Sequence, residues 1–194
     1  MKIKKLATCV SLYEDVFNPE DAEYFLQKLE EDIKDEWNDL TWSNSGVGNQ
    51  GTVTDYRTSL SCSLIPLMKP YPPTELSEFF NLNIREHVDA VVEDYRNENM
   101  LPNAFQEPFG VLKYLPESEY HAHYDHFRDN ARVFSMVGTL KEPEEGGELE
   151  FPTIGLTVPP KVGSVILFPS NFPYIHIAHP VSKGIKFSMV TWYS

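Results

Sequence analysis

From Phe109 onward the chain is a series of short β-prone runs separated by turns, and this pattern limits the folds that it can adopt. The runs are FGVLKYL, ARVFSMVGTL, GGELEFP, GLTVPP, GSVILFPS, YIHIAH and IKFSMVTWY. The 12 Phe, 10 Tyr and 15 Pro of the chain also fit a β-rich body with many turns. Strands this short and closely spaced predict a sandwich or jelly-roll barrel, a double-stranded β-helix.

The part of the chain before this point predicts two helices, over residues 18–37 and 72–97, and a first strand that ends at Val10 to Leu12. Asn18 can cap the first helix, and Pro19 suits its first position. In both helices apolar residues recur at steps of three and four, which indicates a buried stripe. The stripes are Ala22, Phe25, Leu26, Leu29, Ile33 and Trp37, and then Leu76, Phe80, Ile84, Val88, Val91 and Tyr95.

These patterns predict one domain of α+β class, mainly β, over residues 1–194. A helical support with a mobile loop, roughly residues 1–108, would pack on one face of a jelly-roll core, roughly residues 109–194. The loop is the glycine-rich polar segment SNSGVGNQGTVTDYRTS at residues 43–59. It lacks the spacing of a phosphate-binding loop, so a nucleotide site is not expected there.

Charge and cysteine content argue against several classes of protein. The chain has 16 basic and 29 acidic residues and a formal net charge of −13, which disfavours a nucleic-acid partner. Cys9 and Cys62 form no CxxC pair, so no disulfide framework is expected. We also find neither a signal peptide nor a membrane-spanning apolar run, and expect a cytoplasmic protein with no membrane partner.

The segment EYHAHYDHF concentrates potential metal ligands at residues 119–127. In an extended strand His121, His123 and Asp125 would share a side, so two ligand pairs are possible. His121 with His123 and a distant histidine would give an all-histidine, cupin-like centre. His123 with Asp125 and a distant histidine would give a two-His-one-carboxylate centre, which leaves open positions on Fe(II).

The tail of the chain bears on this choice. His176 precedes the PVSKG turn and Lys186 follows it, so a hairpin would bring an ammonium close to the metal. An inward-facing lysine in the apolar run GIKFSMV is costly unless it meets an anion. That anion could be the far carboxylate of an organic acid that chelates the metal.

The ordered motifs of the chain resemble the catalytic core of prolyl 4-hydroxylases, within the Fe(II)/2-oxoglutarate-dependent dioxygenases. The resemblance lies in VLKYLPESEYHAHYDHF, GGELEFP, VGSVILFPS and HIAHPVSKGIKFSMVTW, with YRTSL and LPNAFQEPFGVLKY upstream. It covers roughly residues 10–194. One HxD motif is a weak signal, whereas the ordered set of HxD, GG-x-x-x-FP, His, PV-x-x-G and Lys is specific.

The resemblance implies roles for particular residues. His123, Asp125 and His176 would be the Fe(II) ligands, and Lys186 would pair with the C5 carboxylate of 2-oxoglutarate. The hydroxyl of Tyr114 would also bind this cosubstrate.

Two positions depart from the family pattern. Leu149 replaces a threonine that helps to hold 2-oxoglutarate, and Thr139 replaces a tyrosine. We therefore expect Thr139 at the cosubstrate but with altered contacts. His179 falls at a variable position and is not expected to be a ligand.

The resemblance also places residues around a peptide substrate. Arg57, Ser59, Arg132 and Trp192 fall where family members contact or frame the peptide, and the loop at 43–59 would close over it. His121 and His126 flank the metal motif and are candidates for hydrogen bonds to the ligands.

The function that the resemblance implies is hydroxylation of proline in a peptide or protein, a procollagen-proline 4-dioxygenase-like activity. It would be coupled to the decarboxylation of 2-oxoglutarate to succinate, with O2 as oxidant and ascorbate as a reductant. Two alternatives stay open: the same chemistry on a free amino acid or other small molecule, and a jelly-roll binding module with a vestigial metal site.

Overall fold

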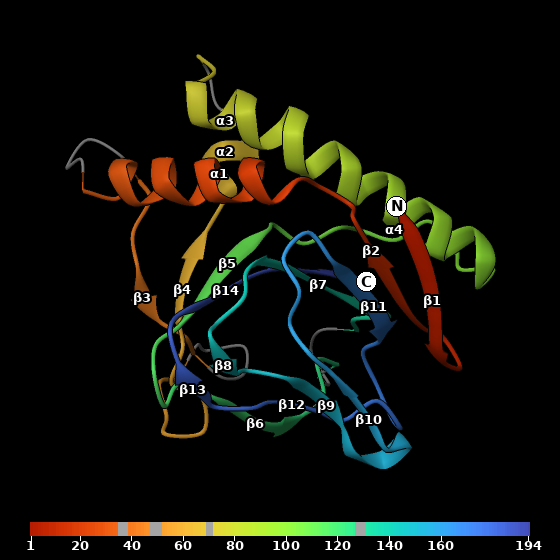
Figure 1. Ribbon diagram of the computed structural model, residues 1–194. Helices are drawn as coiled ribbons and strands as arrows, with labels where there is room; N and C mark the ends of the chain where they lie inside the picture. Colours follow the sequence, from red (N-terminus) through yellow and green to blue (C-terminus); the bar gives the residue numbers. More distant parts are fainter. Residues whose placement is uncertain (35–38, 47–51, 69–71, 127–130) are drawn as a thin grey trace.

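Two antiparallel sheets face each other across the interior of the protein (Figure 1). The computed structural model describes residues 1–34, 39–46, 52–68, 72–126 and 131–194. The larger sheet has eight strands in the order β1-β2-β11-β7-β14-β5-β4-β3. Their bounds are β1 Lys2–Ala7, β2 Val10–Glu14, β3 Ser43–Asn44, β4 Leu60–Ser63, β5 Gly110–Tyr114, β7 Phe134–Lys141, β11 Val165–Pro169 and β14 Lys186–Tyr193. The strands β1 to β4 come from before residue 109, where a single first strand was predicted.

The smaller sheet has four strands in the order β10-β9-β12-β6. Their bounds are β6 Tyr120–His123, β9 Leu149–Phe151, β10 Leu156–Val158 and β12 His176–Ala178. A short 3-10 helix, η2 Pro152–Ile154, joins β9 to β10, and the short strands β8 Glu145–Gly146 and β13 Val181–Lys183 pair with each other.

The helices lie over one face of the larger sheet, as Figure 1 shows, so the predicted mainly β fold with helices on one face is confirmed. They are α1 Pro19–Asp32, α2 Ile65–Met68, α3 Glu75–Phe80, the π-helix η1 Asn81–Arg85 and α4 Glu86–Glu98. Both predicted helices are present. The first begins at Pro19 as expected and has Asn18 at the cap position, although the Asn18 side chain makes no capping hydrogen bond. Trp37, predicted on its stripe, lies outside the described residues.

The larger sheet has two different faces because side chains alternate along a strand. On β14, Phe187 and Met189 pack with the helices in the main hydrophobic cluster, whereas Lys186, Ser188 and Trp192 line a cavity between the sheets. The helices therefore fix one face of the sheet, and the cavity lies on the other.

The first strand differs from the prediction. Val10 to Leu12 do not end a first strand but begin a second one, because β1 and β2 form a hairpin that turns at Thr8 and Cys9. Cys9 takes a positive φ of 54°, which the tight turn requires. Among the described residues, no helix has both the length and the apolar composition needed to cross a bilayer.

Candidate metal centre

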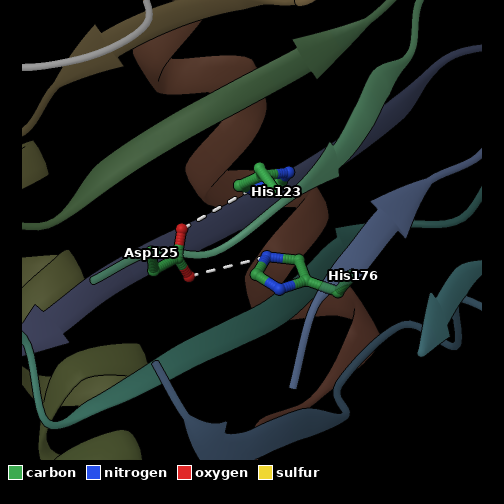
Figure 2. Close-up of side chains that lie close together, drawn as sticks. All are labelled: His123, Asp125 and His176. Atoms are coloured by element: carbon green, nitrogen blue, oxygen red, sulfur yellow. Dashed lines mark ion pairs between the residues drawn. The ribbon is translucent and has the colours of Figure 1, made fainter. Parts of the chain in front are cut away.

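Three side chains from β6, from the segment after it and from β12 converge at one end of the cavity (Figure 2). One ligand atom from each of His123, Asp125 and His176 lies within 4.8 Å of the others. The His123 Nε2 to Asp125 Oδ1 and the His176 Nε2 to Asp125 Oδ2 distances are both 3.6 Å. Within the described ranges this is the one group of His, Cys, Asp and Glu with such geometry.

A β-bulge in β6 decides which histidine faces the cavity. His123 lies opposite His176 and Tyr120 lies opposite Ala178, so three steps along β6 match two along β12. The extra residue puts His123 on the same side as Tyr120, whose ring stacks on it at a centroid distance of 3.5 Å.

His121 consequently points away from this group. Its side chain is 46% exposed, and its Nε2 lies 3.1 Å from Glu119 Oε1. The expectation that His121 and His123 share a side is therefore wrong, and the cupin-like pair is not formed.

Hydrogen bonds set the tautomers of the two histidines. Nδ1 of His123 lies 2.7 Å from the carbonyl oxygen of His121, and Nδ1 of His176 lies 3.2 Å from that of Tyr174. A carbonyl oxygen can only accept, so each Nδ1 carries a proton, and Nε2 is the atom of each ring that can offer a lone pair on the side of Asp125. Three electron-pair donors thus face one another, an arrangement that a divalent cation stabilises.

The protonation states fit the same interpretation. Burial and the neighbouring His123 lower the pKa of His176 to about 4, so this imidazole is neutral at pH 7. Burial alone would raise the pKa of Asp125, but His176, His123 and Ser135 outweigh it and hold that pKa well below its ordinary value. A neutral imidazole and an ionised carboxylate are the forms that bind metal.

The other end of the cavity holds Lys186, which is 5% exposed and lies opposite Tyr114. Its Nζ donates to the carbonyl oxygen of Gly147 at 2.7 Å and lies 4.3 Å from the centroid of the Tyr114 ring. Burial lowers the pKa of Lys186 to about 8, against an opposing effect of Glu148. Gly147 has φ +75°, and a Cβ there would lie 3.2 Å from Lys186 Cδ. The second glycine of the GG motif therefore makes room for the lysine.

His176 and Lys186 are not joined by the predicted hairpin. His176 is on β12, which pairs with β6 and β9, whereas Lys186 is on β14, which pairs with β5 and β7. The chain between them crosses from one sheet to the other. The two residues therefore line one cavity from opposite sheets.

The wall between the two ends carries hydroxyl groups. Thr139 of β7 lies opposite Ser188 of β14, and both are buried residues that line the cavity. Leu149 of β9 lines it from the other sheet and offers no hydrogen bond. Ser188 was not predicted, although its place two residues after Lys186 puts it on the same face of the strand.

Residues 54–59 run along the free edge of β6. The Thr58 amide donates to the Glu119 carbonyl oxygen at 3.0 Å, the His121 amide donates to that of Tyr56 at 3.1 Å, and the Tyr56 hydroxyl donates to that of Ala122. This part of the predicted mobile loop is thus attached to the smaller sheet. Residues 47–51 of the loop lie outside the described residues.

The attached segment places Arg57 at the cavity. Its guanidinium lies 4.7 Å from the centroid of the Tyr120 ring, donates to the Gly46 carbonyl oxygen at 3.0 Å and lines the cavity. Ser59 is 1% exposed, and its Oγ lies 3.0 Å from that of Ser45.

Arg132 and Trp192 form a unit at the metal end. The guanidinium lies 3.8 Å from the centroid of the Trp192 ring and binds both carboxylate oxygens of Glu107 at 2.6 Å. Of the two, Trp192 lines the cavity. An ion pair and a ring stack thus hold its indole in place.

Two further histidines near the proposed ligands, His126 and His179, lie outside the cluster formed by His123, Asp125 and His176. His179 Nε2 is 2.6 Å from Glu150 Oε2, and His126 Nδ1 donates to the carbonyl oxygen of Arg132 at 3.0 Å. The side chains of His121 and His126 make no hydrogen bond to His123, Asp125 or His176 among the described contacts, although the backbone carbonyl of His121 accepts from His123 Nδ1. Behind Asp125, Ser135 donates to the carboxylate and Ser170 bonds Ser135; neither serine was predicted from the sequence.

Comparison with known proteins is consistent with this geometry. Residues 109–194 match the model of the 2OG-Fe(II) oxygenase superfamily. The chain is 31% identical over 134 residues to the Arabidopsis thaliana protein named "Probable prolyl 4-hydroxylase 9", an alignment that covers 54% of this chain and 46% of that protein. The chain thus spans about half the length of the curated relatives that it matches first.

Solved structures share the fold. The 2OG complex of viral collagen prolyl hydroxylase from Paramecium Bursaria Chlorella virus-1 aligns with a TM-score of 0.67 at 19% identity, over 95% of this chain and 94% of that one. The Trichoplax adhaerens prolyl hydroxylase in complex with a hypoxia inducible factor peptide fragment aligns with a TM-score of 0.70 at 14% identity, over 95% and 82%. The resemblance to prolyl 4-hydroxylases and the jelly-roll fold are therefore confirmed.

Proposed function

We propose that this chain is an Fe(II)- and 2-oxoglutarate-dependent oxygenase that hydroxylates proline in a peptide, with prolyl 4-hydroxylase activity. The observation that carries the proposal is the convergence of His123, Asp125 and His176 at one end of a cavity whose other end holds the buried Lys186. A two-His-one-carboxylate set suits Fe(II) and leaves positions open for other ligands. The sequence match over residues 109–194 supports the same assignment.

His123, Asp125 and His176 would hold the iron through two Nε2 atoms and a carboxylate oxygen. Bound there, iron would supply the dioxygen chemistry that couples decarboxylation of 2-oxoglutarate to succinate with hydroxylation of a C–H bond. The protein contributes the placement of the reactants. Apolar side chains between the two ends, among them Val137, Ile166 and Val190, keep water away from the reacting groups.

Lys186 is the residue that we assign to the C5 carboxylate of 2-oxoglutarate. Its ammonium is buried, and a carboxylate would offset the cost of burying that charge. Tyr114 lies beside it, and Thr139 faces Ser188 in the same wall. We infer that these hydroxyl groups take over the hydrogen bonding that Leu149 cannot supply.

A proline-containing peptide or protein is the proposed substrate, because the relatives are named prolyl hydroxylases and one structural neighbour holds a peptide. Arg57 and Trp192 line the cavity and are the proposed peptide contacts. Arg132 would act on the same surface, beside Trp192. Ser59 is buried against Ser45, and its contact with a peptide stays a prediction from the sequence.

Other parts of the assignment are predictions from the sequence. Ascorbate as a reductant, O2 as cosubstrate and a cytoplasmic location belong to this group. So does the division of a single domain into a supporting part, roughly residues 1–108, and a catalytic core, roughly residues 109–194.

The test begins without oxygen. Fe(II) and 2-oxoglutarate are added to the protein, and the weak visible charge-transfer band of the chelate is sought. Oxygen and a library of proline-rich peptides are then added, and the peptides are analysed by mass spectrometry. The proposal expects the band and a gain of one oxygen atom on proline, with the position on the ring fixed by NMR.

The other outcomes separate the alternatives. A band with succinate formation but no peptide oxidation would move the search to free amino acids or other small molecules. No band in iron-loaded protein would contradict the proposal and favour a binding module with a vestigial site.

A further inference from the structure

A pair of buried serines stands behind the carboxylate of Asp125. Ser135 Oγ lies 2.7 Å from Asp125 Oδ2, and Ser170 Oγ lies 2.8 Å from Ser135 Oγ. Both serines are 0% exposed. A buried hydroxyl is costly unless it is hydrogen-bonded, and here each serine is bonded to the next group in a short chain.

The direction of these hydrogen bonds follows from the chemistry of the end group. Ser135 Oγ is the donor to Asp125 Oδ2, and the oxygens of a carboxylate that binds a metal only accept. Ser135 must therefore donate its single hydroxyl hydrogen to Asp125. Ser135 then has only lone pairs left for Ser170, so Ser170 must donate to Ser135.

The position of Asp125 explains why such a support matters. Asp125 lies beyond the end of β6, in an irregular segment. Its backbone is therefore not fixed by pairing with a neighbouring strand, and its carboxylate needs another support. Ser135 is on β7, in the interior of the larger sheet, and Ser170 directly follows β11, the neighbouring strand. The hydrogen bonds thus connect a carboxylate beside the smaller sheet to two adjacent strands of the larger sheet.

We propose that Ser135 and Ser170 are positioning residues, which act through Asp125 to hold its carboxylate in the orientation that binds the metal. The inference rests on the proposed function, because it assumes that the cluster of His123, Asp125 and His176 is a metal site. Ser135 acts directly on Asp125. Ser170 acts through Ser135, by fixing and polarising its hydroxyl group.

The test measures metal affinity rather than turnover. Co(II) is titrated into the full chain, and its visible absorption, which depends on the ligand geometry, gives the dissociation constant; Fe(II) competition is measured without oxygen. Ser135→Ala is expected to raise the dissociation constant by about 10- to 100-fold, the usual effect of losing a hydrogen bond to a metal ligand. Ser170→Ala is expected to raise it by about threefold, because it removes only the polarisation.

Two further variants distinguish positioning from general loss of structure. Ser11→Ala is the matched control. Ser11 is 2% exposed on β2 of the same sheet, two places from β7 in the strand order, and its hydroxyl accepts from Lys5. This variant should bind Co(II) like the unchanged protein. The double variant Ser135→Ala/Ser170→Ala should match Ser135→Ala within about twofold, because Ser170 has no effect without Ser135.

Two results would overturn the inference: a Ser135→Ala dissociation constant within twofold of the unchanged protein, or an equal loss of affinity in Ser11→Ala. Thermal unfolding of each metal-free variant shows whether the chain still folds. If Ser135→Ala does not fold, the Co(II) dissociation constants of Ser170→Ala and Ser11→Ala are compared alone. The proposed function fails separately, if the unchanged protein binds neither Co(II) nor Fe(II) or if His176→Ala binds them equally well.

Discussion

Two ends of the cavity, the metal end with His123, Asp125 and His176 and the lysine end with Lys186, differ in how their side chains are held in place. At the metal end, ligand atoms of His123, Asp125 and His176 lie within 4.8 Å of one another. Ser135 donates to Asp125, and the two histidines donate to backbone carbonyl oxygens, so that these hydrogen bonds fix the orientation of the ligands. At the lysine end, a single flexible side chain meets a backbone carbonyl and an aromatic ring. A metal requires particular ligands in a particular geometry, whereas a carboxylate accepts any well-placed donor.

This difference explains where the chain departs from the family pattern. The metal end keeps every motif residue, but at the lysine end Leu149 and Thr139 replace the expected threonine and tyrosine. Hydroxyl groups on neighbouring strands, such as that of Ser188, can take over the lost hydrogen bonds. The comparison therefore predicts large effects of changes at the metal end and graded effects at the lysine end.

The largest effect is expected for His176→Ala. It removes one of three ligands, so we expect hydroxylation and Co(II) binding to fall below detection. His121→Ala is the control, because the bulge in β6 turns that side chain to the surface, and it should change neither measurement. A loss of Co(II) binding in His121→Ala would restore the all-histidine alternative.

Lys186→Ala should act on 2-oxoglutarate alone. Loss of a buried charge that pairs with a carboxylate is expected to raise the dissociation constant of 2-oxoglutarate by about a hundredfold, with Co(II) affinity unchanged. Lys183→Ala, on an exposed lysine paired with Glu144, should have no such effect. Similar binding of 2-oxoglutarate by the two variants would contradict the assignment of Lys186.

The pH dependence separates the two ends as well. Burial lowers the pKa of Lys186 to about 8, so the free protein loses this charge as the pH rises through that value. Because the charged form binds the dianion, the dissociation constant of 2-oxoglutarate should rise above pH 8, by at most about tenfold per pH unit. Co(II) affinity should not weaken over the same interval, since His176, with a pKa of about 4, is already neutral. Lys186→Arg keeps its positive charge, so in this variant the dissociation constant of 2-oxoglutarate should not rise above pH 8. A rise that persists would mean that a group other than Lys186 titrates there.

Leu149→Thr should strengthen the binding of 2-oxoglutarate at the lysine end of the cavity. If the new hydroxyl reaches the C5 carboxylate, one added hydrogen bond lowers the dissociation constant of 2-oxoglutarate by about fivefold. Leu149→Val has the same shape without the hydroxyl and serves as the control. Equal behaviour of the two variants would mean that the carboxylate lies elsewhere.

The smallest effect is expected for Ser188→Ala. Its hydroxyl is one of several near Lys186, so we expect the dissociation constant of 2-oxoglutarate to rise by about threefold. Combined with Thr139→Val the loss should become larger, because the facing hydroxyl can no longer compensate. Calorimetric titration of 2-oxoglutarate into Mn(II)-loaded protein measures the dissociation constant of the single and the double variant. An unchanged dissociation constant in the double variant would mean that Thr139 and Ser188 take no part in cosubstrate binding.

Local patterns in the sequence predict much of the fold and the ligand set of the site. The apolar stripes of α1 and of α3 to α4, the succession of short strands and the ordered set from His123 to Lys186 are local patterns, with periods set by the helix and the strand. The buried lysine in GIKFSMV could likewise be recognised as needing an anion, because the cost of burying a charge does not depend on the details of the fold.

The remaining features of the site depend on contacts between distant segments, which no local pattern records. The bulge that separates His121 from His123 appears only when β6 is aligned with β12, since register is a property of a strand pair. The crossing between β12 and β14 replaced the predicted hairpin for the same reason. Ser135 and Ser170 had no local signal, because each acquires its role from Asp125, which a distant segment of the chain, after β6, brings beside β7.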